Sequence, residues 1–252
     1  MKPVFSIITV TYNAAQWIEK TIQNVLGQTY DNIEFIVIDG KSTDGTVDII
    51  RKYVSHIAYW ISEPDKGLYD AMNKGLERAS GDYVWFINAG DKIYDEHTIQ
   101  TIVDSLEQKD ILPDIIYGET AIYDKNDQFI GMRRLRSPKR LTWKSFKKGM
   151  LVSHQSFIAK RAIAPLYDVQ YRFSSDFDWC VKCMKKARLI YNSGSILSRY
   201  LDGGISTANR GPSLKERYRI MCIHYGVFQT IIWHIWFAIR FYTAKITRRK
   251  VI

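Results

Sequence analysis

The chain has 252 residues, of which 46% are hydrophobic, and a formal net charge of +10 at pH 7. This length suits one large domain, or one domain with an appendage, and this apolar content excludes disorder as the main state. The excess of Lys and Arg favours anionic partners, such as nucleotides, nucleic acid or anionic lipid headgroups.

The first ninety residues alternate predicted strands and helices. The opening residues, PVFSIITVTYN, lack a basic region followed by an apolar stretch and a cleavage site, so we expect no signal peptide and a cytoplasmic protein. Helical spacing of apolar residues predicts helices that start after Asn13, near 42–44 and near Leu68. Short apolar runs predict four buried strands, at 4–10, 33–38, 57–61 and 83–87. The alternation predicts an α/β fold with a mostly parallel sheet and helices on both faces.

Polar residues follow each of these strands, at the edge where an α/β sheet binds its ligands. A helix cap explains Asp39 or Asp65 taken alone, and a β-turn explains Asp91. Asp91, after a glycine at the end of a central strand, also suits a divalent cation beside a diphosphate. The strand ends read Thr11-Tyr12-Asn13, Asp39-Gly40, Glu63-Pro64-Asp65 and Asn88-Ala89-Gly90-Asp91. Because three of these four ends carry carboxylates around one crevice, we favour a functional site.

The second half has a different pattern. Strands are predicted at 114–117 and 120–123, and 128–132 is predicted to return as a hairpin. Residues 129–167 contain no Asp or Glu and are rich in Lys and Arg. The segment SSDFDWCVKCMKK predicts a loop that enters a helix. Its two cysteines lack the second pair of a zinc site, and with Cys222 they are too few for a disulfide framework, so we expect helix packing in a reducing compartment.

The tail, from about residue 214, is predicted to be helical. Its apolar stretch, 227–242, is shorter than the ~20 residues that span a bilayer, and Arg240 interrupts it. On a helical wheel Gln229, Thr230 and His234 fall on one side, opposite the apolar side chains Phe228, Ile231, Ile232, Ile235 and Ile239. Two interpretations remain open, an amphipathic helix lying in a membrane interface and a helix packed on the domain.

Five segments of the chain resemble family 2 glycosyltransferases of the GT-A fold. They are FSIITVTYNAAQWIEKTIQNVLGQTYDNIEFIVIDGKSTDGT, SEPDKGLYDAMNKGLERASGDYVWFINAGD, HQSF, SSDFDW and GGIS, in family order over roughly residues 3–207. The resemblance implies a GT-A domain over 1–212, with a nucleotide-binding half (1–95) and an acceptor-binding half (96–212). Residues 213–252 then form a helical, basic tail that is a candidate for association with a membrane surface.

The resemblance implies roles for the first strand ends. Thr11, Tyr12 and Asn13 are expected to line the nucleotide pocket. Asp39 is expected to bind the base or ribose of a nucleoside-diphosphate sugar, and Asp65 to hold it from the other side.

The stretch Asn88–Asp91 occupies the family's D-x-D position. Asp91 is therefore expected to bind Mg²⁺ or Mn²⁺, and Asn88 and Gly90 to lie against the nucleotide-sugar. The sequence departs from the family here, because Asn88 and Gly90 are not carboxylates. A cation would then depend on one carboxylate and on phosphate oxygens.

Asp176 matches the family's catalytic base. In inverting transfer, this carboxylate removes the proton from an acceptor hydroxyl as the oxygen attacks the anomeric carbon. Asp178, two residues further on, is a second candidate, and a surface or capping carboxylate is the alternative interpretation.

Two more segments resemble family elements near the reacting groups. His154 and Gln155 resemble the H-Q segment that lies near the acceptor and the diphosphate. The GGIS segment resembles a flexible loop that closes over the diphosphate, with Gly204, Ser206 and Arg210 as its candidate contacts. A structural histidine and a simple turn are the alternatives.

The resemblance implies an inverting glycosyltransferase of the bacterial polysaccharide type. It would move a sugar, a hexosyl or N-acetylhexosaminyl group, from a nucleoside-diphosphate sugar to a hydroxyl of a glycan or lipid-linked saccharide acceptor. UDP is the expected nucleotide, no nucleic-acid partner is expected, and the basic stretches suit the anionic inner face of the cytoplasmic membrane. The alternative is a non-catalytic, basic nucleotide-, nucleic-acid- or membrane-binding protein of the same fold. Nucleotidylyltransferases and dinucleotide oxidoreductases require a Gly-rich loop after the first strand, where this chain has Thr-Tyr-Asn.

Overall fold

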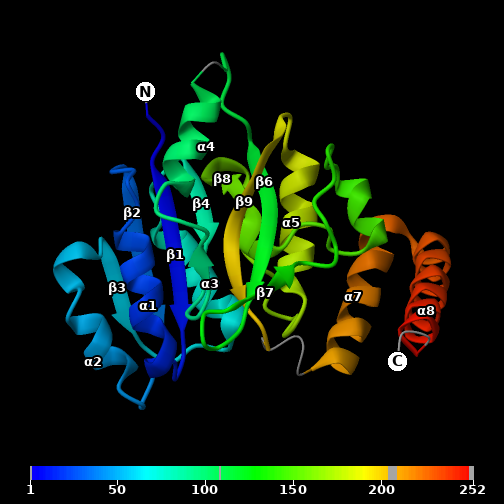
Figure 1. The fold of residues 1–252 in the computed structure, drawn as a ribbon, viewed down its shortest axis with the longest axis horizontal. Coiled ribbons are helices and arrows are strands. Elements are labelled where there is room, and N and C mark those ends of the chain that lie inside the picture. The colour runs from blue at the N-terminus through cyan, green and yellow to red at the C-terminus, as the bar shows by residue number, and fades with distance from the viewer. Residues whose placement is uncertain (1, 108, 204–208, 250–252) are drawn as a thin grey trace.

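The computed structural model describes residues 2–107, 109–203 and 209–249, with the backbone alone for 210 and 240–249. Within these residues nine strands join in one sheet. They are β1 (Phe5–Thr11), β2 (Ile33–Asp39), β3 (Tyr59–Ser62), β4 (Tyr83–Phe86), β5 (Lys92–Ile93), β6 (Ile115–Tyr123), β7 (Phe129–Met132), β8 (Phe157–Lys160) and β9 (Ile190–Leu201). Their order in the sheet is β3-β2-β1-β4-β8-β6-β9-β5, with β7 paired to β6 (Figure 1).

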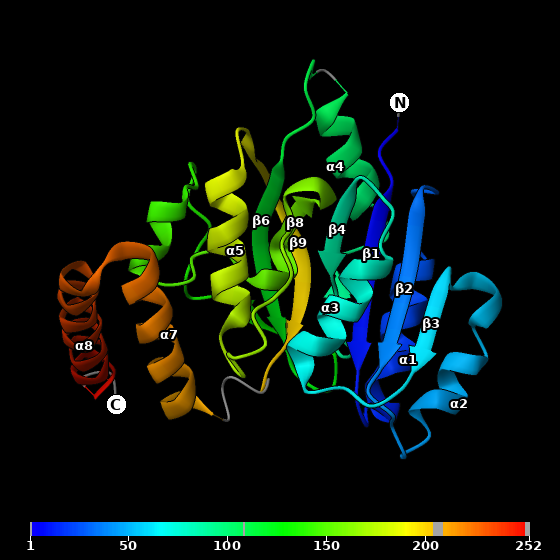
Figure 2. The ribbon, with the colours of Figure 1, turned by 180° about the vertical axis from the view of Figure 1, so that it is seen from behind.

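The helices cover both faces of this sheet. They are α1 (Ala15–Leu26), α2 (Thr46–Arg51), α3 (Leu68–Arg78), α4 (Thr98–Leu106), α5 (Ser175–Lys186), α7 (Arg210–Tyr225) and α8 (Val227–Arg249). Short 3₁₀ turns lie at η1 (Val54–His56), η2 (Trp143–Lys148), η3 (His154–Ser156) and η4 (Arg161–Ile163). Helices α1, α2 and α4 lie on one face and α3 and α5 on the other, as Figures 1 and 2 show from opposite sides. Their apolar side chains form one buried cluster on each face.

The first half of the sheet is parallel, as the sequence predicts. Strands β3, β2, β1 and β4 run in the same direction, and the register places Thr11 opposite Asp39. Every residue of β1 is buried, because helices pack against both sides of this strand. The carboxyl ends of β1, β2 and β4 therefore meet at one edge of the sheet.

The second half of the sheet is mixed. Strand β8 runs antiparallel to β4 and β6, β7 forms a hairpin with β6, and β9 lies parallel to β6. The prediction of two strands around Gly118 is wrong, since β6 continues through this residue. A Cβ on Gly118 would lie 2.5 Å from the carbonyl oxygen of Ser195, so the glycine allows β9 to approach closely where the register shifts.

The tail is two helices rather than one. The chain turns at Gly226, which has a φ of +84°, and α8 folds back beside α7 (Figure 2). On α7, the side chains of Ile220, Met221 and Tyr225 are buried in the same apolar cluster as α3 and α5. The tail therefore begins as part of the core.

Helix α8 places its apolar side outward. Thr230 is fully buried, and Trp233 and Phe237 pack against the apolar cluster. The exposed row contains Phe228, Ile231, Ile232, Ile235 and Ile239. In the part of the chain that the structure describes, no helix is long and apolar enough to cross a membrane.

Candidate active site

The loops after β1 and β2 interlock. The Ser42 hydroxyl donates to Oδ1 of Asp39 at 2.5 Å and accepts the backbone N–H of Asn13 at 2.7 Å. Asn13 has a φ of +46°, and its Oδ1 accepts the N–H of Thr43 at 2.9 Å. Asn13 therefore does not cap α1, because its side chain ties the two loops together. Oδ2 of Asp44 instead accepts the N–H of Ala15, at the start of α1.

Asp39 is buried at the end of β2 and is held by its own neighbours. Its Oδ2 accepts the N–H of Ser42 at 2.9 Å and the hydroxyl of Ser62 at 2.6 Å. Opposite it, the Oγ1 of Thr11 is buried and has no partner among the described residues. Because a buried hydroxyl normally finds a partner, Thr11 offers an open hydrogen-bonding group at the strand end.

Tyr12, Gly40 and Asp65 form one wall at this edge of the sheet. A Cβ on Gly40 would lie 2.4 Å from Oδ2 of Asp65 and 3.3 Å from the ring of Tyr12. Oδ1 of Asp65 accepts the N–H of Gly67 at 2.7 Å, just before α3. The Tyr12 side chain is 66% exposed. A flat aromatic surface beside a carboxylate suits a nucleobase and its ribose, which need stacking and hydroxyl acceptors.

The chain turns sharply after β4. The N–H of Asp91 donates to the carbonyl of Asn88 at 2.9 Å, and Gly90 has a φ of +101°. The hydroxyl of Thr21, on α1, accepts the N–H of Gly90 at 3.0 Å and donates to the carbonyl of Asp91 at 2.9 Å. A Cβ on Gly90 would lie 2.9 Å from the Leu201 side chain, so this position favours glycine in two ways.

Asp91 lies beneath the surface, with 5% of its area exposed. Gln155 Nε2 donates to its Oδ2 at 2.9 Å, and the N–H of Leu201 donates to its Oδ1 at 3.1 Å. Burial raises the pKa of Asp91 to about 7, although both hydrogen bonds act in the opposite direction. This carboxylate therefore links three segments, β4, η3 and the end of β9.

The donor atoms in this turn do not fit a tightly held Mg²⁺ or Mn²⁺. Such ions usually take one or two carboxylates in addition to phosphate oxygens and water. Both Asp91 oxygens accept internal hydrogen bonds, and Asn88 offers a neutral amide oxygen, which is buried without a partner in the described structure. Among the described residues, no group of three or more His, Cys, Asp or Glu side chains converges.

Asp176 lies in the first turn of α5, where its carboxylate is half-buried. The hydroxyl of Tyr69, from the first turn of α3, donates to its Oδ1 at 3.2 Å. Burial, and the charge of Asp176, hold the pKa of Tyr69 well above its usual value, so this hydroxyl remains a donor. The contact joins the start of α3 to the helix that follows the basic stretch.

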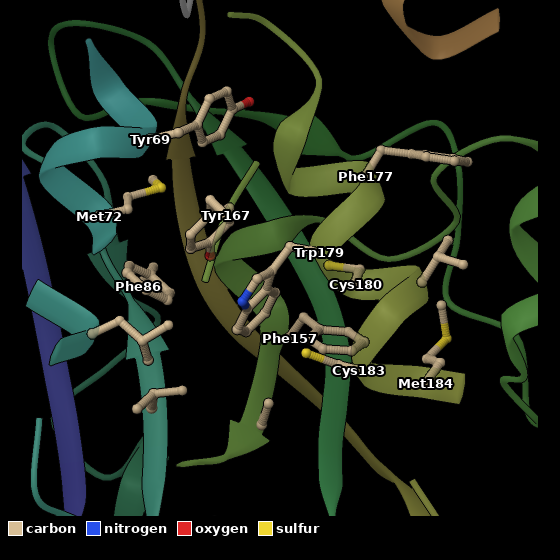
Figure 3. Packing of buried hydrophobic residues seen from close by; sticks show 14 of the residues in the cluster. Tyr69, Met72, Phe86, Phe157, Tyr167, Phe177, Trp179, Cys180, Cys183 and Met184 are labelled. Carbon is tan, nitrogen blue, oxygen red and sulfur yellow. The ribbon is translucent and has the colours of Figure 1, made fainter. Parts of the chain in front are cut away.

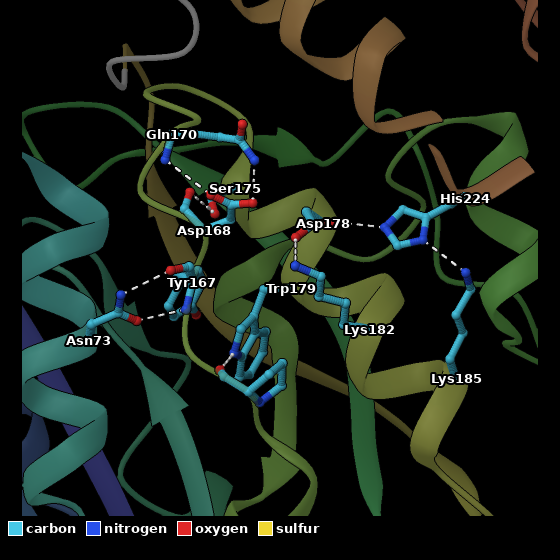
Figure 4. Close-up of polar contacts among 11 residues, drawn as sticks. Asn73, Tyr167, Asp168, Gln170, Ser175, Asp178, Trp179, Lys182, Lys185 and His224 are labelled. Carbon is cyan, nitrogen blue, oxygen red and sulfur yellow. Dashed lines mark hydrogen bonds and ion pairs between the residues drawn. The ribbon is translucent and has the colours of Figure 1, made fainter. Parts of the chain in front are cut away.

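Aromatic rings pack together between α3 and α5 (Figure 3). Tyr167 stacks between Tyr69 and Trp179, with ring centres 5.6 and 5.1 Å apart, and Phe86 meets Tyr167 edge-on. The side chain of Asn73 holds the backbone of Tyr167 through two hydrogen bonds, of 2.9 and 2.7 Å (Figure 4). These contacts fix α3 relative to α5.

His154 and Gln155 have separate structural roles. His154 is buried among the aromatic rings, and its Nε2 lies 2.5 Å from the Tyr167 hydroxyl. Burial lowers the pKa of His154 to about 4, so the ring is neutral at pH 7. Gln155 supports Asp91 from below. The structure thus places His154 in the core and Gln155 at the turn after β4.

Asp178 points toward His224 of the tail (Figure 4). Its Oδ1 is 2.6 Å from Nε2 of His224 on α7, and Lys182 forms an ion pair with its Oδ2 at 2.6 Å. Burial raises the pKa of Asp178, but these two partners outweigh burial and the net shift is downward. Cys180 and Cys183, on the same helix, are buried in the core as expected from helix packing (Figure 3).

Three predicted residues near the diphosphate have no described side chain. Gly204 and Ser206 lie outside the described residues, and Arg210 begins α7 without a described side chain.

Residues 6–164, more than half of the chain, match the family model described as Glycosyl transferase family 2. The chain belongs to family 2 of the glycosyltransferases. Two uncharacterised glycosyltransferases, from two strains of Mycobacterium tuberculosis, are each 32% identical over 185 residues, which cover 71% of this chain and 68% of theirs. The putative teichuronic acid biosynthesis glycosyltransferase TuaG of Bacillus subtilis is 44% identical over 96 residues, covering 36% of this chain and 37% of TuaG.

Solved structures share the fold of this family 2 glycosyltransferase. S. aureus TarS 1–349 in complex with UDP superposes with a TM-score of 0.68 at 18% identity, covering 87% of this chain and 64% of TarS 1–349. The mannosyltransferase PcManGT from Pyrobaculum calidifontis, in complex with GDP-Man and Mn²⁺, gives 0.59 at 16% identity, covering 92% of this chain and 74% of that one. The family 2 chain therefore has the GT-A fold, as the sequence predicts. It spans less than two thirds of the length of the TarS chain.

Several residues at this site of the glycosyltransferase carry no motif. Thr21 contacts Asp91, and Tyr69 contacts Asp176, from helices whose sequence pattern indicates only packing. The Arg217 guanidinium lies over the ring of Phe177, the residue after Asp176. Burial lowers the pKa of Arg133 to about 10, and the charge of Asp176 acts in the opposite direction. The only sequence signal for Arg133 is its place in a basic stretch without carboxylates.

Proposed function

We propose that the protein is an inverting glycosyltransferase that moves a sugar from a UDP-sugar to a hydroxyl of a glycan or lipid-linked saccharide in cell-surface polysaccharide synthesis. The observation that carries this proposal is the pairing of Asp176 with Tyr69 at 3.2 Å, above the aromatic cluster. It gives a half-exposed carboxylate a fixed position between the strand ends and the basic stretch.

The proposed reaction uses Asp176 as the base. Its carboxylate takes the proton of the acceptor hydroxyl while the oxygen attacks the anomeric carbon of the donor sugar. The new C–O bond forms on the face opposite the leaving group. The bond from the anomeric carbon to the diphosphate breaks, and the nucleoside diphosphate leaves with the electron pair. Tyr69 is a positioning residue that holds the carboxylate by one oxygen.

The nucleotide is proposed to lie at the ends of β1 and β2. The exposed ring of Tyr12 stacks on the base, and Asp65 holds the ribose. Asp39, the second group expected at the base or ribose, is buried and bonded to Ser42 and Ser62, so it reaches the nucleotide only if these hydrogen bonds open. TarS has been solved with UDP and with UDP-GlcNAc, which supports a UDP-sugar as donor and leaves hexosyl and N-acetylhexosaminyl groups as alternatives. The names of TuaG and of a PGL/p-HBAD biosynthesis glycosyltransferase from Mycobacterium bovis, 27% identical over 214 residues, support a glycan or glycolipid acceptor.

Binding of a divalent cation is less well supported for this chain than for the family. The resemblance implies Mg²⁺ or Mn²⁺, and PcManGT was solved with Mn²⁺. The donor atoms at Asn88 and Asp91 fit such an ion poorly, for the reasons given above. No step of the proposed transfer therefore uses a metal.

We also propose that the protein works on the anionic inner face of the cytoplasmic membrane. The exposed apolar row of α8 supports this location, because it is suited to the boundary between headgroups and acyl chains. The basic residues at the end of the tail, Arg248, Arg249 and Lys250, and the net charge of +10 favour anionic lipid.

The first test is thermal unfolding with UDP, GDP, dTDP and CMP, followed by transfer assays with sugars of the nucleotide that binds. A ligand at 100 times its Kd stabilises a protein by about 2.7 kcal/mol, which gives a readily measured rise in Tm. We expect the largest rise with UDP. If none of the four nucleotides raises the Tm, the non-catalytic alternative is favoured.

A further inference from the structure

A polar groove lies along α1, on the face of the sheet opposite to α3 and α5. Residues of α1, β5, β9 and the turn before α4 line a hollow of about 520 Å³, a size typical of small-molecule sites. A smaller hollow adjoins it, because Lys20, Lys92 and Arg199 line both. The groove begins at Trp17, in the first turn of α1, and ends at Gly27, just after this helix.

This groove runs away from the proposed nucleotide and from Asp176. Helix α1 connects the parallel strands β1 and β2, so it runs back from their carboxyl ends toward the opposite edge of the sheet. Figures 1 and 2 show α1 and α5 on different faces of the sheet. Only the narrow end of the groove, beside Gly90, approaches the turn after β4. The groove is therefore separate from the proposed position of the base and from that of the nucleotide.

Arg199 is held in a fixed position in this groove. Its guanidinium carbon is 5.0 Å from the ring centre of Tyr123 and 5.4 Å from that of Tyr94, and its Nε donates to the carbonyl of Tyr94 at 2.6 Å. Among the described residues, Nη1 and Nη2 of Arg199 have no hydrogen-bond partner, and no carboxylate lies within 4.0 Å of the guanidinium. The two Nη groups are therefore open to a ligand.

The carboxylates in and beside the larger hollow have partners of their own. Asp127 forms an ion pair with Lys92 at 2.7 Å, and Oδ1 of Asp95 accepts the N–H of His97 at 3.0 Å. The carboxylate of Glu96 lies 3.3 Å from Nε2 of His97.

Two cations of the larger hollow therefore remain without a carboxylate. They are Lys20 and Arg199, for which the described structure shows no ion pair. A guanidinium presents paired N–H donors that match two oxygens of a carboxylate or phosphate group. The larger hollow therefore suits a ligand that carries an acidic group.

The other lining groups favour a saccharide over a polyanion. Trp17 and Tyr123 line the smaller hollow, and aromatic rings offer flat apolar surfaces to the faces of sugar rings. Asp95 and Glu96 line the larger hollow, where they would repel an evenly charged chain such as nucleic acid. A saccharide with few acidic groups can pair with the cations and avoid these carboxylates.

We propose that this groove binds an acidic saccharide, in which a carboxylate or phosphate group pairs with Arg199 and Lys20 and the sugar rings lie against Trp17 and Tyr123. The inference rests on the proposed function in one respect, since it makes the glycan acceptor or product anionic. It gives this glycan a second contact, away from the base.

Calorimetric titration with tetragalacturonate and with the neutral maltotetraose tests the proposal. Wild-type protein should bind tetragalacturonate about tenfold more tightly than maltotetraose, or better still. Arg199→Gln should weaken the binding of tetragalacturonate about tenfold, which corresponds to about 1.4 kcal/mol, and Lys20→Gln about threefold. Arg199→Lys, which keeps the charge, should lose less affinity than Arg199→Gln.

A second pair of ligands distinguishes the two kinds of acidic group. Glucose 6-phosphate carries a phosphate on a sugar, and inorganic phosphate is its control. Tighter binding of the sugar phosphate than of free phosphate would support the inference and would identify phosphate as a group that the groove accepts.

Lys52→Gln is the matched control for Lys20→Gln. Lys52 is exposed at the end of α2, outside the groove, and this variant removes the same charge. It should bind tetragalacturonate like the wild type. All four variants should bind UDP like the wild type, which also reports that each chain is folded.

Two results would overturn the inference. One is that neither acidic saccharide binds more tightly than its control ligand, and the other is wild-type affinity in both Arg199→Gln and Lys20→Gln. Failure of the wild type to bind any nucleotide would instead count against the proposed function. Because saccharide and nucleotide are titrated separately, the two failures are distinguishable.

Discussion

The hydroxyl of Tyr69 donates to Oδ1 of Asp176 at 3.2 Å, across 107 positions of the chain. Tyr69 belongs to the helix after β3, and Asp176 to the helix after the basic stretch. This hydrogen bond and the stacked rings beneath it bring the two halves of the site to a fixed distance.

Replacing Asp176 by Asn should reduce the turnover of sugar transfer by roughly 10²–10⁴-fold, because the variant lacks a base for the acceptor proton. Binding of UDP, measured by titration calorimetry, should not change. Since Asn is nearly isosteric with Asp, the Tm should stay close to that of the wild type. Transfer at the wild-type rate would remove Asp176 from its assigned role.

Replacing Tyr69 by Phe should lower kcat about tenfold and leave the KM for the donor unchanged. The variant keeps the stacked ring and loses only the hydrogen bond to a charged oxygen, which is worth about 1.5–3 kcal/mol in proteins. Steady-state kinetics of the two proteins measure the effect. A matched control is Tyr191→Phe, because Tyr191 lies in β9 and packs in the apolar cluster on the other face of the sheet. An equal loss in both variants would mean that the Tyr69 hydroxyl has no special role.

Replacing Gly40 by Ala should weaken UDP binding by at least fivefold. The new Cβ would lie 2.4 Å from Oδ2 of Asp65, so the carboxylate must move away from the proposed ribose position. Gly211→Ala is the control, because a Cβ at Gly211 meets nothing within 4 Å. Calorimetry with UDP distinguishes the two, and equal affinities would show that Asp65 does not contact the nucleotide.

Asp91 and His154 should change stability with pH in opposite directions. The folded pKa of Asp91 is raised to about 7, so its contribution to the free energy of unfolding is full below about pH 4 and is lost as pH rises through 7. The folded pKa of His154 is lowered to about 4, so its contribution is full above about pH 6.5 and is lost as pH falls toward 4.

Urea unfolding of Asp91→Asn and His154→Gln between pH 4 and 8 checks this expectation. The free energy of unfolding of the wild type, minus that of Asp91→Asn, should fall with rising pH. The same difference for His154→Gln should rise. A pH-independent difference in either case would contradict the burial of that group.

Replacing Ile231 and Ile235 together by Glu should reduce cosedimentation with phosphatidylglycerol vesicles by tenfold or more. Both side chains are exposed on α8, so the change adds charge to the apolar row without opening a cavity. Ile111→Glu is the control, since Ile111 is also exposed but precedes β6, far from the tail. If the wild type binds neutral vesicles as well as anionic ones, the electrostatic part of the proposal is contradicted.

The first half of the fold is predictable from local signals. The apolar runs of β1, β2 and β4 and the helical spacing between them fix a parallel sheet, and its register then places Thr11 opposite Asp39. The mixed half is less predictable, because its strand pairs lie far apart in the sequence. Gly118 shows the difficulty, since a glycine that permits close approach of β9 looks the same in the sequence as one that ends a strand.

The sequence predicts the residues of the site better than it predicts the contacts between them. The sequence indicates that Asp91 and Asp176 matter, but the partners of Asp91 are 64 and 110 positions away. No spacing rule reveals that Gln155 and Leu201 occupy both of its oxygens. Similarly, the sequence indicates an amphipathic tail, but the break at Gly226 and the packing of Trp233 decide which side of α8 faces solvent.

The packing of α7 bears on how the enzyme can be shortened. Trimming the tail at residue 213 to improve expression would remove Ile220, Met221 and Tyr225 from the core, and would strip Asp178 of His224. A cut at Gly226 would instead remove α8 alone and keep the α7 contacts, although it would uncover the apolar surface against which Trp233 and Phe237 pack. The shortest chain worth purifying therefore ends after Tyr225.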